Sequence, residues 1–209
     1  MTKWSDDAVE LGASKVGPVV LGETPFATNE QTRQIVLNAR NGVTTIDRSM
    51  YADAQERGNY LEESLIYWAS DKLDAMCADN VACNYIPTTD AHRKTDLRLC
   101  ASLDAILEVV GGELTIPNPQ GDPITVKGYG ALEIKTDGWD DGPPRAEQVI
   151  QLQTQMLCAE FEWGVIAKLG PKLKFELYPY RRSEKLIKLI MEKVADFWYR
   201  VDMDHPYPP

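Results

Sequence analysis

Two charged side chains stand close together in the stretch GYGALEIKT, residues 128–136. Side chains alternate along a β-strand, so Glu133 and Lys135 would share one face of a strand with Ala131. Leu132 and Ile134 would then lie on the opposite, apolar face. A carboxylate and an ammonium held side by side at the edge of a core form either a simple ion pair or the centre of a reactive site. Taken alone, the pair favours the ion pair, because about one acid-x-lysine triplet is expected by chance in a chain of average charge.

Two further carboxylates occupy positions where a charge is costly. Asp104 closes the segment ASLD, which the sequence predicts as the end of a strand. Glu62 lies on a predicted helix, where helical spacing places it on one face with Leu65 and Ala69. Its neighbour Glu63 would point outward. A carboxylate that points inward needs a partner or a bound cation, so these positions are candidates for chemistry.

Carboxylates that converge on one point repel each other, and a divalent cation relieves that repulsion. Mg²⁺ prefers oxygen ligands in octahedral geometry and keeps several waters, so a few carboxylates and a main-chain carbonyl suffice. Such an ion can activate water and stabilise charge on a phosphoryl group. Lys135 could then position or deprotonate the attacking water, or stabilise the transition state. Glutamines recur at helical spacing in EQVIQLQTQML, and one that points inward could orient Lys135 or the water; they are Gln148, Gln151 and Gln155.

The composition limits the class of protein. A chain of 209 residues can form one well-buried domain, and we expect a single domain over residues 1–209. The hydrophobic content of 44% and the charged content of 26% are typical of a soluble globular protein. The net charge of −10 argues against non-specific binding to nucleic acid, which depends on neutralising phosphates. It does not exclude a metal-dependent enzyme, because a metal site requires carboxylates and a local basic patch can coexist with them.

Membrane segments, secretion signals and cysteine frameworks are not indicated. No apolar run reaches the ~20 residues of a membrane span, and MTKWSDDAVE lacks the signature of a signal peptide. We therefore expect a cytoplasmic protein with no membrane partner. The cysteines form no C-x-x-C pair, so we expect free thiols rather than a disulfide framework, a zinc site or an iron–sulfur cluster; they are Cys77, Cys83, Cys100 and Cys158.

The order of predicted elements indicates the fold class. Helices are expected over residues 28–42, 51–73, 145–160 and from 183 onward, and the first has a capping-box pattern in Thr28 and Gln31. Strands are expected over residues 96–109, 131–136, 163–169 and 173–180, with a hairpin over 111–130 around the turn NPQGDP. The tryptophans at 139, 163 and 198 are expected in the core or in loop packing. This order predicts an α/β or α+β domain with a central mixed sheet flanked by helices.

The motifs together resemble the PD-(D/E)xK nuclease superfamily, and within it the YqaJ-type phage recombination exonucleases. LGASKVGPVVLG resembles the opening glycine–serine element, and RGNYLEESLI resembles the G-x-x-x-E helix. CASLDAIL resembles the strand end that carries the aspartate, and LEIKT resembles the E-x-K element. PPRAEQVIQLQTQMLCA resembles the glutamine-bearing helix, and ADFWYRVDMDHPYPP resembles the closing FW-x-x-V segment. The resemblance covers most of the chain in order and implies a restriction-endonuclease-like core.

The resemblance also implies an activity and its partners. It implies 5′→3′ digestion of linear double-stranded DNA, dependent on Mg²⁺ or Mn²⁺, leaving 3′ overhangs for recombination by strand annealing. It implies a ring-shaped homotrimer, a single-strand-annealing protein as partner, and a phage or prophage protein in the cytoplasm of a bacterial host. By the same resemblance, the metal would be held by Asp104, Glu133 and the main-chain carbonyl of Ile134, with Glu62 at a second site. Lys135 would handle the nucleophilic water and Gln151 would support it.

The chain departs from the family pattern at two places. Leu103 precedes the aspartate where a proline is common. An arginine associated with the 5′-phosphate has no counterpart before the opening element, and the possible substitutes are otherwise expected as solvated surface residues; they are Arg33, Arg93, Arg98, Arg181 and Arg182. The basic segments HRKTDLR and KLGPKLK would contact DNA or serve only solubility.

Three functions remain open from the sequence. The first is the phage-type exonuclease. The second is a RecB-type or restriction-type endonuclease, against which the missing cysteine cluster and the missing target-recognition domain weigh. The third is a catalytically inactive acidic binding protein of the same fold, in which Glu133 and Lys135 form only an ion pair.

Overall fold

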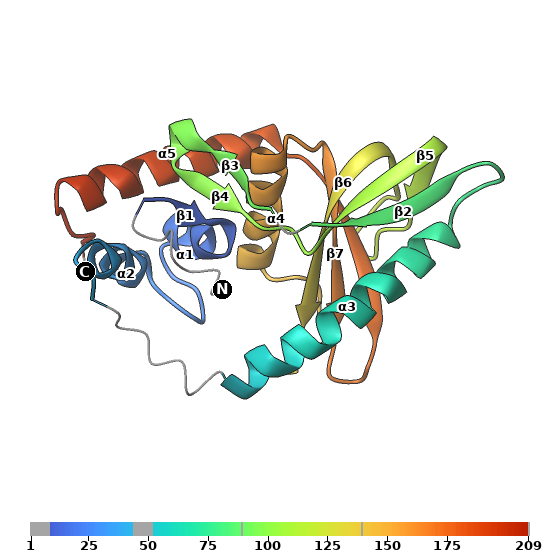
Figure 1. The fold of residues 1–209 in the computed structure, drawn as a ribbon, viewed down its shortest axis with the longest axis horizontal. Helices are drawn as coiled ribbons and strands as arrows, with labels where there is room; N and C mark the ends of the chain where they lie inside the picture. The colour runs from blue at the N-terminus through green and yellow to red at the C-terminus, as the bar shows by residue number, and fades with distance from the viewer. Residues whose placement is uncertain (1–8, 44–51, 89, 139, 209) are drawn as a thin grey trace.

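A mixed five-stranded sheet forms the centre of the structure, a computed structural model that describes residues 9–43, 52–88, 90–138 and 140–208 (Figure 1). The strand order is β2-β5-β6-β7-β8; β6 and β7 run parallel, and the other neighbouring pairs are antiparallel. The strands are β2 (Ala82–Pro87), β5 (Ala105–Ile116), β6 (Ile124–Thr136), β7 (Trp163–Leu169) and β8 (Phe175–Arg181). The predicted central mixed sheet and the β5–β6 hairpin are therefore confirmed.

A second, three-stranded sheet was not predicted. It has the order β1-β4-β3 and consists of β1 (Leu11–Gly12), β3 (His92–Lys94) and β4 (Leu99–Ala101). The prediction of one strand over residues 96–109 is wrong, because β4 ends at Ala101 and β5 begins at Ala105 in the other sheet. Burial continues to alternate across the break, with Leu103 and Leu107 both buried, so the sequence period does not reveal it. Asp104 thus lies immediately before a strand rather than at the end of one.

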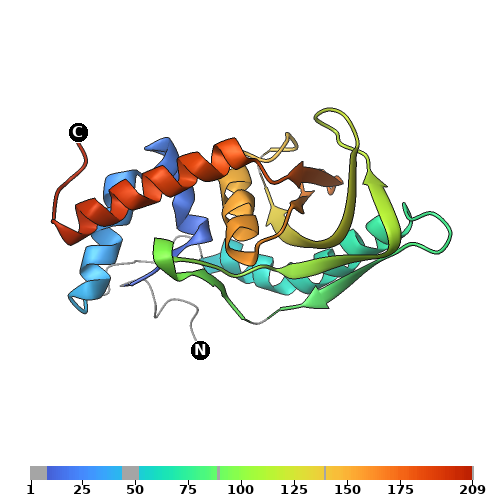
Figure 2. The same ribbon diagram turned by 90° about the horizontal axis from the view of Figure 1, so that it is seen from above.

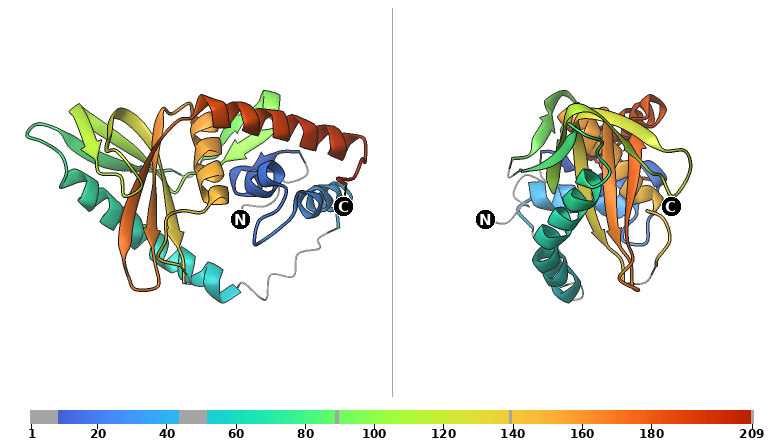
Figure 3. Two further views of the ribbon diagram at one scale, coloured as in Figure 1. Left: turned by 180° about the vertical axis from the view of Figure 1, so that it is seen from behind. Right: turned by 90° about the vertical axis from the view of Figure 1, so that its right-hand side faces the viewer.

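Helices cover the five-stranded sheet on both faces, as Figures 2 and 3 show. One face is covered by α4, with α1, α2 and α5 beyond it, and the opposite face is covered by α3. The helices are α1 (Val16–Leu21), α2 (Asn29–Arg40), α3 (Ala52–Asp74), α4 (Ala146–Ala159) and α5 (Glu184–Asp202). The long helices match the predictions, although the predicted first residue of α3, Tyr51, lies outside the described residues. The capping box of α2 is present, since Thr28 and Gln31 each bond the other's backbone nitrogen.

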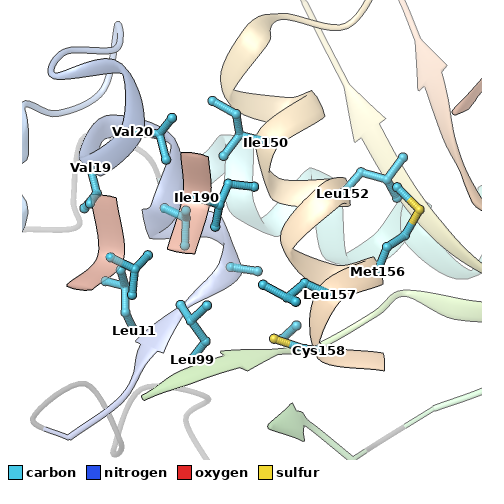
Figure 4. Packing of buried hydrophobic residues seen from close by; sticks show 14 of the residues in the cluster. Leu11, Val19, Val20, Leu99, Ile150, Leu152, Met156, Leu157, Cys158 and Ile190 are labelled. Atoms are coloured by element: carbon cyan, nitrogen blue, oxygen red, sulfur yellow. The ribbon is translucent and has the colours of Figure 1, made fainter. Parts of the chain in front are cut away.

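Two hydrophobic cores lie on the two faces of the sheet. The α4-side core combines residues of α1, α4, α5 and the three-stranded sheet, including Val19, Leu152 and Ile190 (Figure 4). The α3-side core lies beneath α3 and includes Leu73 and Leu132. Strand β6 contributes to both cores, because its side chains alternate between the two faces. The strand that carries the predicted reactive pair is therefore fixed from both sides.

Trp163 and Trp198 are buried, as expected, whereas Trp139 lies outside the described residues. The Trp163 ring lies directly over the backbone of Gly130 on β6, and its Nε1 donates to the carbonyl of Lys127 at 3.0 Å. Only glycine leaves room for the indole at this position. Within the described residues, no helix is both long enough and apolar enough to span a membrane.

The contact between Gly130 and Trp163 can be tested by adding one methyl group. A Cβ at Gly130 would overlap the buried indole, so Gly130→Ala should destabilise the protein by about 1–3 kcal/mol in urea unfolding. Gly58→Ala in α3 is the control, because an added Cβ meets nothing within 4 Å there. That helical substitution should stabilise the protein by up to ~1 kcal/mol. Wild-type stability in Gly130→Ala would contradict the packing.

Candidate active site

Glu133 is the buried carboxylate at the centre of the candidate site, with 3% of its surface exposed. It lies on the face of β6 that α4 covers, together with the buried Ala131 and the half-buried Lys135. Leu132 and Ile134 point into the α3-side core on the other face. The predicted alternation along β6 is therefore confirmed, and it places a charge beneath a helix.

Four hydrogen bonds join Glu133, Lys135 on β6 and two glutamines of α4, and three of them are accepted by the Glu133 carboxylate. Lys135 Nζ donates to Glu133 Oε1 and also to Gln151 Oε1, the latter at 3.0 Å. Gln151 Nε2 donates to the same Glu133 oxygen at 2.6 Å. Gln155 Nε2 donates to the other oxygen, Oε2. The structure thus brings together Glu133, Lys135 and Gln151 as the sequence predicted, and adds Gln155, which had been noted only as part of the glutamine stripe.

Asp104 joins this cluster through the backbone of β6. Its Oδ2 accepts a hydrogen bond from the Ile134 backbone nitrogen at 2.7 Å. This is possible because Ala105 pairs with Leu132 in the antiparallel register of β5 and β6. Asp104 therefore lies beside the end of β6 that carries Glu133. It belongs to the connection between β4 and β5, which passes from one sheet to the other and was not predicted.

The charges at the site perturb each other. Burial raises the pKa of Asp104 well above its usual value; the Glu133 carboxylate adds to this and so does Glu62, while the bond from Ile134 opposes it. Glu62 is half-buried on α3, and Glu63 is exposed, as their spacing predicted. The charge of Glu62 therefore acts on Asp104 from the neighbouring helix.

Lys135 remains a cation in this setting. Burial of its ammonium lowers its pKa, but the attraction and hydrogen bond of the Glu133 carboxylate, together with the charge of Asp104, outweigh that effect. The net result is a pKa of Lys135 above its usual value. The site therefore contains one stable positive charge beside carboxylates that destabilise one another.

The oxygen-rich character of the site fits a hydrated Mg²⁺ or Mn²⁺ ion. In the part of the chain that the structure describes, no three His, Cys, Asp or Glu side chains form a preformed metal cage. Mg²⁺ does not require one, since it keeps several waters and is commonly held by one or two carboxylates together with substrate phosphates. The negative charges of Glu133 and Glu62 repel the Asp104 carboxylate, and a divalent cation bound between them would offset that repulsion.

A buried charge network that the sequence did not predict connects β6, β7 and α4. Asp137, just after β6, lies 3.4 Å from Lys168 Nζ and accepts a 2.7 Å bond from Arg145. Lys168 is 2% exposed and donates to the carbonyl of Gly142 at 2.9 Å. Lys168 belongs to the segment KLGPKLK, which was expected to contact DNA or to serve only solubility, but β7 is buried on both faces and Lys168 lies inside the protein. The continuous apolar run WGVIAKL is the signal that could have indicated this.

The expectation that the five candidate arginines are solvated surface residues is wrong for Arg33; Arg93 and Arg181 are exposed as expected. The other two, Arg98 and Arg182, are half-buried. Arg33 is buried and paired with Glu30 and Asp204. Each of the others donates to a carboxylate or a carbonyl of the protein; the partners are Glu10 for Arg93, Asp202 for Arg98, Thr125 for Arg181 and Glu184 for Arg182. The structure thus gives all five a partner within the protein.

Comparison with solved structures shows that the chain has the fold of alkaline and phage-related exonucleases. It is similar to an alkaline exonuclease, LHK-Exo from Laribacter hongkongensis, with a TM-score of 0.67 and 18% identity over 98% of this chain and 94% of that one. The complex of LHK-Exo with dAMP gives a TM-score of 0.66 at 18% identity, over 97% and 92% of the chains. A phage-related exonuclease from Haemophilus somnus gives 0.56 at 14% identity, over 93% and 94%. In sequence, no protein-family model and no curated protein matches the chain.

The buried network can be tested by removing its ammonium. Lys168→Met leaves Asp137 with one cation fewer in the interior, so it should lower the free energy of unfolding by about 2–4 kcal/mol. Lys172→Met is the matched control, because Lys172 is 85% exposed and lies 3.6 Å from Asp141. It should cost at most ~1 kcal/mol. Equal unfolding midpoints of the two variants would contradict a stabilising role for Lys168.

Proposed function

We propose that this protein is a metal-dependent exonuclease that digests linear double-stranded DNA from its 5′ ends and leaves 3′ overhangs. The observation that carries the proposal is the convergence of Asp104, Glu133, Lys135 and Gln151 in one cluster at the end of β6. The fold, which this chain has in common with exonuclease structures, supports it. Within this proposal, the cluster is a reactive centre rather than an isolated ion pair.

Each side chain of the cluster has a role in the proposed reaction. Asp104, Glu133 and the main-chain carbonyl of Ile134 would hold Mg²⁺ or Mn²⁺, with Glu62 supporting a second ion. When bound, such an ion lowers the pKa of water and offsets charge on a phosphoryl group. Lys135 would stabilise the negative charge of the transition state and position the attacking water, because its ammonium is held by Glu133 and Gln151.

The proposal extends to the assembly and to the product's use. A chain with a net charge of −10 gains little from non-specific attraction to DNA. A ring-shaped homotrimer would hold DNA by enclosing it and would need fewer phosphate contacts. The 3′ overhangs would be substrates for recombination, with a single-strand-annealing protein as partner, in the cytoplasm of a bacterial host.

The activity can be tested on linear duplex DNA with Mg²⁺. Wild-type protein should release label from the 5′ ends first and leave closed circular DNA intact. Lys135→Ala should reduce the rate by roughly 10²–10⁴-fold, because it removes the ammonium beside the reacting phosphate. Lys188→Ala is the matched control, since Lys188 is an exposed lysine on α5, outside the cluster and both basic segments, and should leave the rate unchanged.

Each contrary outcome identifies a different error. Cleavage of the closed circle would indicate the endonuclease. Survival of the linear duplex with wild-type protein would favour an acidic binding protein. Wild-type activity of Lys135→Ala would show that the cluster is not the reactive centre.

A further inference from the structure

Gln155 contacts both segments that carry the acidic residues of the site. It lies in the middle of α4, and its side chain is fully buried, with 0% exposed. Its Nε2 donates to Glu133 Oε2 on β6 and to the carbonyl of Ser102 at 3.0 Å. Ser102 belongs to the segment between β4 and β5 that leads to Asp104. One amide nitrogen therefore joins the strand of Glu133 to the segment of Asp104.

The two oxygens of Glu133 have separate donors. Lys135 and Gln151 both donate to Oε1, whereas the donor to Oε2 is Gln155. Gln151 therefore cannot replace Gln155 in fixing the orientation of the carboxylate plane. Without Gln155, Oε2 would be a buried acceptor with no donor among the described residues, and the carboxylate could rotate.

The amide oxygen of Gln155 shows that stability alone does not explain this residue. Gln155 Oε1 is buried and has no hydrogen-bond partner among the described residues. An unsatisfied buried acceptor is destabilising, so each one in a native protein calls for an explanation, of which a role in catalysis or ion binding is one. The chain thus retains a costly amide at the position where its nitrogen holds two parts of the site.

We propose that Gln155 is a positioning residue of the site: it orients the Glu133 carboxylate and fixes the Asp104 segment against β6, so that both are ready to hold a divalent cation. This inference rests on the proposed function. Partners of this kind typically contribute 10–100-fold to metal affinity or activity, because they hold the ligands in place before the metal binds.

Gln153 provides a matched control on the same helix. Its side chain is 2% exposed. Like Gln155, it makes two hydrogen bonds, but both go to backbone atoms. Its Nε2 donates to the carbonyl of Arg181 at 2.9 Å, and its Oε1 accepts from the Ser183 nitrogen at 2.9 Å. These contacts fasten α4 to the last residue of β8 and to the N-cap of α5, and they do not involve the site. Gln153→Met and Gln155→Met therefore each remove one buried amide, but only Gln155→Met removes it from the site.

The test measures binding of Mn²⁺ alone by calorimetry, the thermal unfolding midpoint, and kcat and KM on linear duplex DNA. Gln155→Met should weaken Mn²⁺ binding by about 10–100-fold and lower kcat similarly, with KM for DNA unchanged. Excess Mn²⁺ should restore part of the activity. Gln153→Met should keep the wild-type Mn²⁺ affinity and kcat. If Gln155→Met does not fold, Gln155→Asn replaces it, because its shorter side chain cannot reach both acceptors and should give the same loss.

The outcomes separate this inference from the proposed function. If wild-type protein binds Mn²⁺ and degrades DNA, and the Gln155 and Gln153 variants behave alike, the positioning role is wrong and the proposed function stands. If wild-type protein neither binds Mn²⁺ nor degrades DNA, the proposed function fails and this inference fails with it. A selective loss in the Gln155 variants supports both.

Discussion

The burial of the Glu133 charge is the constraint on which the rest of the site depends. A carboxylate that is 3% exposed must be surrounded by donors, because an unpaired charge in the interior is too costly to keep. The donors come from β6 itself and from the facing side of α4. Helix α4 must therefore pack on β6 in one register, with its amides opposite the carboxylate and its apolar residues in the core beside it. The same contacts that satisfy the charge thus determine where the helix lies.

Strand β6 can carry this charge because it is held from both faces. Its apolar residues Leu132 and Ile134 belong to the α3-side core, while Ala131 belongs to the α4-side core. The chain passes between the two sheets at residues 102–104, next to the same part of β6. Asp104 lies at this passage, so a backbone segment that belongs to neither sheet is placed against the central strand. The site therefore lies where the three-stranded sheet meets the five-stranded sheet.

Local patterns in the sequence predicted one part of the fold and site, and contacts between distant segments determined the rest. The alternation around Glu133 and the helical spacing of Gln151 are properties of short segments, so the sequence was sufficient for both. The end of β4 before Ser102 was missed, because burial alternates without interruption across it. The apolar run WGVIAKL could have indicated the interior position of Lys168, but not its acceptor, because the carbonyl of Gly142 is 26 residues away in the chain. Periodicity indicates which face a side chain occupies but not which distant partner it meets.

The pairing of β5 with β6 has a consequence for how this chain can vary. The ladder is regular from Ala105–Leu132 to Val109–Gly128, and its register shifts only further out, between Val109 and Leu114. A slip of one residue near the site would turn Glu133 into the α3-side core and place Ile134 beneath the amides. Beyond the bulge, Leu114, Ile116 and Val126 still pack in the α3-side core, so only the turn at residues 117–123 is free of this requirement. Evolution could therefore lengthen or shorten the hairpin tip in related chains while the spacing from Gly128 to Lys135 stays invariant.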